Sequence, residues 1–381
     1  MENPQPEPKI ETKNKKLLFI HPGGLGDVVL LLPALQNLRD GFEPDWQIDL
    51  LVEKRAYQGS LELFSINKIV DKVKTFDFKN KYALLQFPEL IRQIGGYSTV
   101  ISSGSSPLVS LLLFFSGAKK RVGFKSNLDF LLTDPIKLNK EQYAARMLWE
   151  LTQPLTRVIT QKTDKEKAIP QLKLDTKAIP VEGLLTGRYL LIHPGVSVLS
   201  IIKRIIKTPG SFFWSDLIDK LDQKLKNTDI KIALVAGPDE KEIAKEIIKN
   251  CKSASNKIVD LSESSFSLPE LIQLIAGSAA FVCADSAPLH LGICVGANIV
   301  ALFGPTDPNK LLPNANDYTS LYGGNTLSLV KVTNLLCQPC LWNRRSQSCG
   351  APICVDWQDP NVVLEALSGV LDLKVAKESH L

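Results

Sequence analysis

Residues 280–308 read AFVCADSAPLHLGICVGANIVALFGPTDP, and they contain two apolar strand patterns on either side of a helical pattern. We expect strands at 280–284 and 299–303, with Asp285 directly after the first of them. A strand, a helix and a second strand in this order are typical of a βαβ unit, whose strands pair in parallel. The stretch therefore predicts an α/β fold that binds ligands at the carboxyl ends of its strands.

The same alternation extends over the rest of the chain in two runs, and each run opens on a strand followed by His-Pro-Gly. Further strands are expected at 16–21, 46–52, 98–102, 121–124, 189–193 and 230–236. Between the runs, lysines and two Ala-Ile-Pro repeats indicate a connection. The chain should therefore form two Rossmann-like parallel-sheet domains that face a cleft. The boundaries are a disordered tail at 1–15, a first Rossmann-like domain at 16–165, a linker at 166–187, a second Rossmann-like domain at 188–345, and a cysteine cluster with a C-terminal helix at 337–381.

The composition fits a globular protein of two domains. The chain has 381 residues, of which 44% are apolar and 22% charged, with a net charge of +5. Such values exclude a wholly disordered or fibrous chain, and no basic stripe with interleaved aromatics predicts nucleic-acid binding. The polar start, without an apolar signal core, predicts a cytoplasmic protein.

The longest apolar run, 108–115, is too short to span a bilayer, which takes about 18 residues or more. It predicts a core helix. The alternative is an apolar edge that touches a membrane surface beside Lys119, Lys120 and Arg121.

A glycine-rich turn, Gly23-Gly24-Leu25-Gly26-Asp27, follows the first strand. A dinucleotide fingerprint would need a third glycine where this chain has Val29, although Glu53 stands where a ribose-binding acid would. Asp27 has two interpretations: a helix N-cap, which spacing alone favours, or a general base at the mouth of the cleft.

The turn at 285–290 places an acid, a hydroxyl and an imidazole within six residues. Pro288 suits the first position of a helix, which would leave Ser286 and Ala287 to present polar groups to a phosphate. His290 would lie one helical turn further on. The alternative is that Asp285 and Ser286 only cap the helix and His290 is a buried polar residue.

Four segments together resemble the successive motifs of the heptosyltransferase family, glycosyltransferase family nine. They are LGDVVLLLPALQNLR at 25–39, RVGF at 121–124, IHPG at 192–195 and the stretch 285–308. The resemblance covers about residues 16–360. It implies a GT-B fold and an inverting, metal-independent transfer of a heptose or related sugar. The donor would be a nucleotide diphosphate sugar, with an ADP-sugar favoured.

The resemblance also implies partners and a location. The acceptor would be the lipopolysaccharide core or another cell-surface glycan, reached from the inner face of the plasma membrane by peripheral contact. No cofactor would be required.

Carried over by position, the family motifs assign roles to single residues. Asp27 becomes the catalytic base, which overturns the preference for a cap, and Gly24 and Gly26 line the acceptor cleft. The donor would be bound by Lys207 (with Lys203 as the fallback), Glu240, Asp285, Ser286, Ala287 and His290.

The chain also departs from the family pattern. His21-Pro22-Gly23-Gly24 stands where relatives commonly carry an Arg before Leu-Gly-Asp. Ser286 and Ala287 replace a Thr and a Gly. The hydroxyl is kept, so phosphate binding should survive, whereas the sugar pocket is expected to differ.

Seven cysteines are present, and Cys337, Cys340, Cys349 and Cys354 fall within eighteen residues. Four thiols can form a tetrahedral structural zinc site; reduced thiols or a redox-labile pair are the alternatives. For the whole chain, the rival functions are a nucleotide-sugar epimerase, a nicotinamide oxidoreductase that uses Glu53, and a non-catalytic interaction protein.

Overall fold

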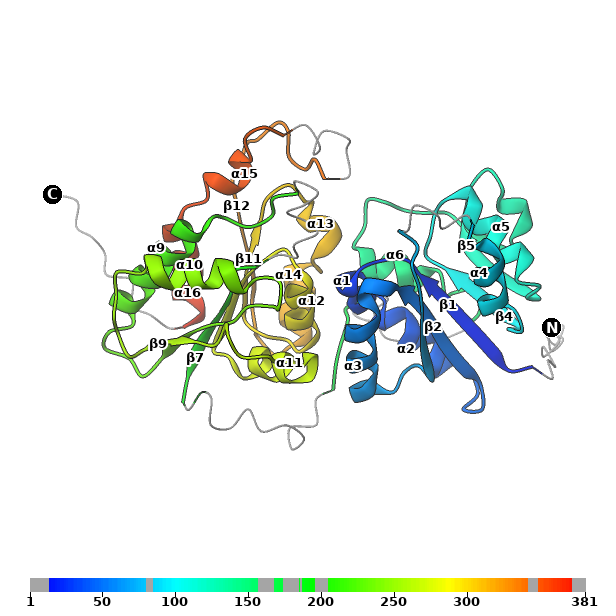
Figure 1. The fold of residues 1–381 in the computed structure, drawn as a ribbon, viewed down its shortest axis with the longest axis horizontal. Helices are drawn as coiled ribbons and strands as arrows, with labels where there is room; N and C mark the ends of the chain where they lie inside the picture. Colours follow the sequence, from blue (N-terminus) through cyan, green and yellow to red (C-terminus); the bar gives the residue numbers. More distant parts are fainter. Residues whose placement is uncertain are drawn as a thin grey trace, which may run out of the picture.

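The computed structural model describes residues 14–79, 85–156, 168–173, 185, 187–195, 205–341 and 349–371. Two six-stranded sheets lie side by side, each flanked by helices (Figure 1). Every strand pair in both sheets is parallel. The predicted α/β class with two Rossmann-like sheets is confirmed.

The first sheet has the order β3-β2-β1-β4-β5-β6. Its strands are β1 (Lys16–His21), β2 (Gln47–Glu53), β3 (Lys72–Phe76), β4 (Thr99–Ser102), β5 (Lys120–Phe124) and β6 (Asp134–Ile136). Its helices are α1 (Leu25–Leu30), α2 (Leu32–Gly41), α3 (Tyr57–Asn67), α4 (Phe87–Ile94), α5 (Pro107–Phe115) and α6 (Ala144–Glu150), with short 3-10 turns η1 (Lys54–Ala56) and η2 (Asp129–Leu131).

The second sheet has the order β12-β11-β10-β7-β8-β9. Its strands are β7 (Tyr189–His193), β8 (Lys231–Leu234), β9 (Ile258–Asp260), β10 (Ala280–Ala284), β11 (Ile299–Phe303) and β12 (Leu327–Lys331). Its helices are α9 (Ser211–Lys224), α10 (Lys241–Asn250), α11 (Leu268–Gly277), α12 (Ala287–Cys294), α13 (Pro308–Leu311), α14 (Ala315–Leu321), α15 (Ile353–Asp356) and α16 (Pro360–Val370).

Both faces of each sheet are buried, as continuous apolar strands require. In β1, Leu17 and Phe19 enter one apolar cluster, while Leu18 and Ile20 enter another on the opposite face. The first of these clusters continues through α1 and α12 to Leu191 of β7, in the second sheet. The two halves therefore share a packed apolar contact at their centre.

That central contact places the ends of two helices against each other. α1 packs on α12, and α3 packs on α11 (Figure 1). The backbone N–H of Leu268, at the start of α11, donates to Glu62 Oε2 of α3 at 2.7 Å. Since α1 and α12 each follow the central strand of their own sheet, the carboxyl ends of β1 and β10 come to face one region.

One sequence expectation is corrected here. The run 108–115 is helical, but it is not a core helix. Leu112 and Leu113 are buried, whereas α5 exposes apolar side chains on its other face: Leu108, Phe114 and Phe115.

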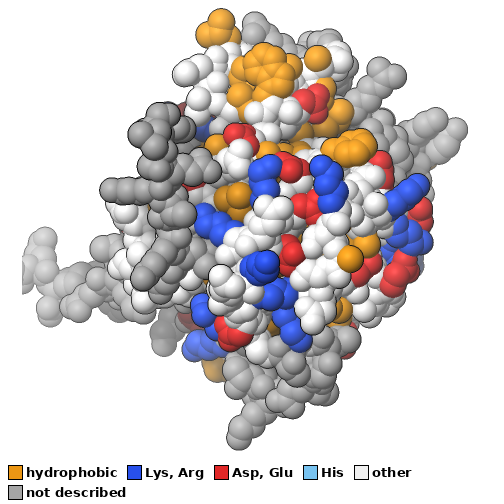
Figure 2. Space-filling model, turned by 90° about the vertical axis from the view of Figure 1, so that its left-hand side faces the viewer, with side chains coloured by type: hydrophobic (Ala, Val, Ile, Leu, Met, Phe, Trp, Pro, Cys, Tyr) orange, Lys and Arg blue, Asp and Glu red, His pale blue; other side chains and the backbone are white. Residues whose placement is uncertain are grey.

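Charges are mixed on the outer end of the second half. Figure 2 shows Lys and Arg side chains interspersed with Asp and Glu over this face, and the apolar side chains gather mainly near its upper part. Such a face lacks the basic stripe that a nucleic-acid surface requires.

Candidate functional site

Asp27 lies in the first turn of α1, directly after β1, and its side chain is exposed. The prediction that Asp27 is the N-cap is wrong: Gly24 is the N-cap residue, and Asp27 at the third helical position accepts from the Gly24 N–H with Oδ2 at 2.8 Å. Within the described residues, the second oxygen, Oδ1, accepts no hydrogen bond. One carboxylate can therefore hold the turn and still present an oxygen to a ligand.

α12 faces Asp27 from the second half of the molecule. A Cβ on Gly26 would lie 3.2 Å from His290 Cδ2 and 3.5 Å from Ala287 Cα, so the glycine permits the close approach of the two helices. Asp27 is near enough to His290 to raise the pKa of its imidazole. The structure thus brings together Gly26, Asp27, Ala287 and His290.

Close to this contact, Lys207, which precedes α9, forms an ion pair with Asp285, which follows β10. Lys207 Nζ lies 2.8 Å from Asp285 Oδ2, and the Thr306 hydroxyl donates to the same oxygen at 2.7 Å. Asp285 is buried, and a buried carboxylate without partners would be costly. The pair therefore fixes the lysine beside the start of α12, with part of its side chain still exposed.

The N-terminus of α12 leaves polar groups unused. Ser286 is the N-cap residue, yet its side chain makes no capping hydrogen bond; its hydroxyl donates to Ala284 O at 3.3 Å. Pro288 occupies the second helical position, where an N–H is not needed. The Leu289 N–H donates to Ser286 O at 3.1 Å, so the Ala287 N–H and the helix dipole are what make this end suited to an anion.

His290 is buried on the same helix, and no described residue bonds its Nδ1. Burial lowers the pKa of His290; Asp285 and Asp27 raise it in part, and Lys207 lowers it. The imidazole is therefore neutral at pH 7, with a single N–H to donate.

Glu240 lies apart from this group, at the start of α10 after β8. Its Oε2 accepts from the Gly237 N–H at 2.7 Å and lies 3.3 Å from His193 Nε2. No residue of the α12 turn is among these contacts. Lys203, the fallback for Lys207, lies outside the described residues.

The Glu53 carboxylate already has a hydrogen-bond partner within the protein. It is buried at the end of β2, and its Oε2 accepts from the Phe78 N–H at 3.1 Å. The carboxylate therefore holds the chain after β3, and this leaves the nicotinamide interpretation of Glu53 without support.

Sequence reasoning missed three residues of the site. His21 and His193 end β1 and β7 and lie next to Asp27 and Glu240, and Thr306 holds Asp285. The repeated strand-His-Pro-Gly pattern was the signal for the two histidines. Thr306 lies inside the motif at 285–308, but its role depends on how β11 and β10 lie side by side.

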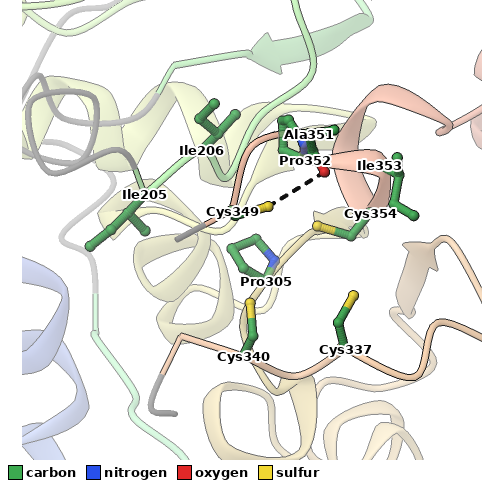
Figure 3. Close-up of a pocket in the computed structure, with 10 residues that line it drawn as sticks. All are labelled: Ile205, Ile206, Pro305, Cys337, Cys340, Cys349, Ala351, Pro352, Ile353 and Cys354. Carbon is green, nitrogen blue, oxygen red and sulfur yellow. Dashed lines mark hydrogen bonds between the residues drawn. The ribbon is translucent and has the colours of Figure 1, made fainter. Parts of the chain in front are cut away.

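The four clustered cysteines line one cavity of about 160 Å³, together with Ile205, Ile206 and Pro305 (Figure 3). All four are free thiols. Burial raises the pKa of Cys340 and of Cys354, to about 11 for the latter, and the neighbouring thiols raise both further. As the side chains stand, no group of three or more His, Cys, Asp or Glu in the described part of the chain is placed to hold a metal ion.

The cysteine segment rests on the loop that carries Thr306. The N–H groups of Cys340 and Leu341 donate to Pro305 O at 2.9 and 3.1 Å, and Gln338 donates to Gly304 O. The segment therefore contacts the loop whose Thr306 hydroxyl donates to Asp285.

The chain is similar to known proteins in three comparisons: with a family sequence model, with individual sequences and with solved structures. The sequence model described as glycosyltransferase family 9 (heptosyltransferase) matches residues 88–333, well over half of the chain; Asp27 lies outside that range. Lipopolysaccharide heptosyltransferase 3 of Escherichia coli is 23% identical over 319 residues (79% of this chain, 86% of the relative). Lipooligosaccharide heptosyltransferase 2 of Campylobacter jejuni is 25% identical over 371 residues (96% and 99%). The solved structure of E. coli ADP-heptose lps heptosyltransferase II has a TM-score of 0.64 at 18% identity, covering 95% of this chain and all of that one.

Proposed function

Because the chain belongs to glycosyltransferase family 9, the heptosyltransferase family, we propose that it transfers a heptose or related sugar with inversion and without a catalytic metal. The donor is a nucleotide diphosphate sugar, with an ADP-sugar favoured because a structural relative is described as an ADP-heptose enzyme. The acceptor is a lipopolysaccharide core or a related cell-surface glycan, as the names of the relatives suggest. One observation supports this most: an exposed carboxylate, Asp27, faces the α12 anion site across the contact between the halves.

In the proposed reaction, Asp27 accepts the proton of the acceptor hydroxyl, whose oxygen attacks the anomeric carbon of the donor. The bond between that carbon and the diphosphate oxygen breaks, and its electron pair leaves with the nucleoside diphosphate. The attack comes from the face opposite the leaving group, so the configuration inverts. Lys207, the Ser286 hydroxyl and the Ala287 N–H of α12 stabilise the charge that develops on the diphosphate.

The remaining donor residues have supporting roles in this proposal. Asp285 holds Lys207 in place, His290 donates its single N–H to the sugar or the diphosphate, and Ala287 lets the donor approach the helix backbone. Glu240 would bind the ribose, with Lys203 as a second cation. Gly24 and Gly26 leave room for the acceptor.

Asp27→Asn is expected to lower kcat by roughly 10²–10⁴-fold, because the amide keeps the shape of the side chain but is no base. Donor affinity should change little. Lys207→Met should instead weaken donor binding, since the diphosphate then loses the cation that stabilises its charge. Radiolabelled sugar transfer gives kcat and calorimetry gives the Kd for the donor, with Asp216→Asn on α9 as the control. Equal loss of stability in all variants, with specific activity retained, would show that the residues are structural.

We further propose that the first half touches a membrane surface through α5 and its neighbours. Five apolar side chains are exposed there: Leu85, Leu108, Phe114, Phe115 and Phe130. Phe115 contacts Phe87 of α4, Arg121 lies over the ring of Phe114, and Lys119 is exposed close by. In the described residues no helix has the length and apolarity to cross a bilayer, so contact through this basic, apolar end would be peripheral.

Anionic vesicles of phosphatidylglycerol and phosphatidylethanolamine should bind the chain, and Leu108→Ser with Phe115→Ser should abolish that binding. Binding is expected because the apolar side chains become buried in the lipid interface, and the serine substitutions remove that burial. Vesicle flotation measures it, with Phe212→Ser and Trp357→Ser, two exposed aromatics of the other half, as the matched control. Equal binding by both double variants would contradict the proposed surface.

The four cysteines give a third proposal, a structural zinc ion that holds the segment between β12 and α15. Four free thiols around one cavity are a donor set that zinc accepts, although the sulfurs must draw closer together than they now stand. No step of the transfer involves this ion.

Chain purified without chelator is expected to contain about one zinc per molecule by elemental analysis. Cys337→Ser and Cys354→Ser should lose the metal because each removes one thiolate, whereas Cys251→Ser, at a half-buried cysteine outside the cluster, should keep it. Metal-free wild-type protein, or equal metal content in all three variants, would refute the zinc site.

A further inference from the structure

His21 is buried at the end of β1, yet one of its ring nitrogens has no partner in the described structure. Its Nδ1 lies 2.7 Å from Ser103 Oγ, whereas Nε2 is unpaired. A buried polar atom without a hydrogen-bond partner destabilises the fold. The nitrogen is therefore expected to gain a hydrogen-bond partner, either through a small movement or when a substrate binds.

The space in front of Nε2 leads to Asp27. A Cβ on Gly23 would lie 2.5 Å from His21 Nε2 and 2.9 Å from Asp27 Oδ2, so the nitrogen and the oxygen border the same small volume. Only a glycine leaves that volume open. Hydrogen bonds in empty active sites are often long and shorten in the substrate complex.

The other half of the molecule already shows such a pair. His193 also ends a strand before Pro-Gly, and its Nε2 lies 3.3 Å from Glu240 Oε2. Glu240 accepts from the N–H of Gly237, three residues earlier, as Asp27 does from Gly24. A strand-terminal imidazole beside a glycine-held carboxylate is therefore an arrangement that this chain forms.

We propose that His21 is a positioning residue that holds the Asp27 carboxylate for proton abstraction, an inference that rests on the proposed function. The Ser103 hydroxyl donates to Nδ1, which places the ring proton on Nε2. Nε2–H then donates to Asp27 Oδ2, beside the Gly24 N–H. Oδ1 stays directed at the acceptor hydroxyl and takes its proton.

The charges around the ring agree with a neutral donor. Burial lowers the pKa of His21, and Asp27 on α1 raises it by a smaller amount. On the far side of Asp27 stands His290 of α12, which is also neutral, with Asp285 and Lys207 acting on it. Asp27 is thus the carboxyl group whose charge acts on His21.

Two substitutions separate positioning from packing. His21→Gln can place an amide N–H near the position of Nε2, whereas His21→Asn reaches only toward Ser103. We expect His21→Asn to lower kcat by roughly 10²-fold, the effect of a misplaced catalytic group, and His21→Gln to recover most of that loss. Donor Kd should be unchanged in both, and Ser103→Ala should lose less than His21→Asn. Wild-type kcat in His21→Asn, or equal loss in both His21 variants with the fold intact, would overturn the proposal.

A readout without activity separates this inference from the proposed function. Nitrogen-15 NMR of the full chain should show the ring proton of His21 on Nε2, and Asp27→Asn should lower the His21 pKa by removing the negative charge. If the wild type transfers no sugar, the proposed function is wrong, but the NMR measurement still shows whether His21 contacts Asp27. A proton on Nδ1, or a pKa that Asp27→Asn leaves unchanged, would refute the pairing of His21 with Asp27.

Discussion

The site depends on one close approach, that of α1 to α12 at Gly26. Each helix follows the central strand of its own sheet, and the apolar cluster that joins them runs from β1 to β7. Any side chain at Gly26 would press on His290 and Ala287. Because the first turns of the two helices meet, an acid on one and an anion-binding N-terminus on the other can serve a single substrate.

The charged side chains of the site are held in place by neighbouring ion-pair and hydrogen-bond partners. Asp285 is buried but has Lys207 and Thr306, and Asp27 is exposed but is held by Gly24. The turn at Asp285 holds a cation beside the anion site, whereas the turn at Asp27 leaves a carboxylate oxygen available. This division of roles suits a transfer in which one group must take a proton and another must stabilise a leaving diphosphate.

Sequence patterns predicted the interior of both sheets and missed their edges. β1, β7 and β10 are continuous apolar runs because both of their faces are buried. The four strands that were not predicted, β3, β6, β9 and β12, are the four edge strands, which are short or partly exposed. α5 was misjudged for a related reason: composition gives its apolarity but not which face the sheet leaves uncovered.

Local spacing favoured an N-cap for Asp27, but the N-cap is Gly24; Asp27 accepts the Gly24 N–H with one oxygen, while the other stays unbonded in the described residues. Partners from distant segments, such as Thr306 for Asp285 or Ser103 for His21, have no sequence signal at all. They follow from strand order, which a single sequence does not determine.

The contact between the halves can be measured by a disulfide. A Cβ on Gly26 would lie 3.8 Å from Ala287 Cβ, the usual separation in a disulfide. Gly26→Cys with Ala287→Cys should therefore crosslink under mild oxidation, as shown by peptide mapping, while neither single variant does. If the double variant stays reduced, or if it links only to native cysteines, α1 and α12 do not meet and the shared site is contradicted.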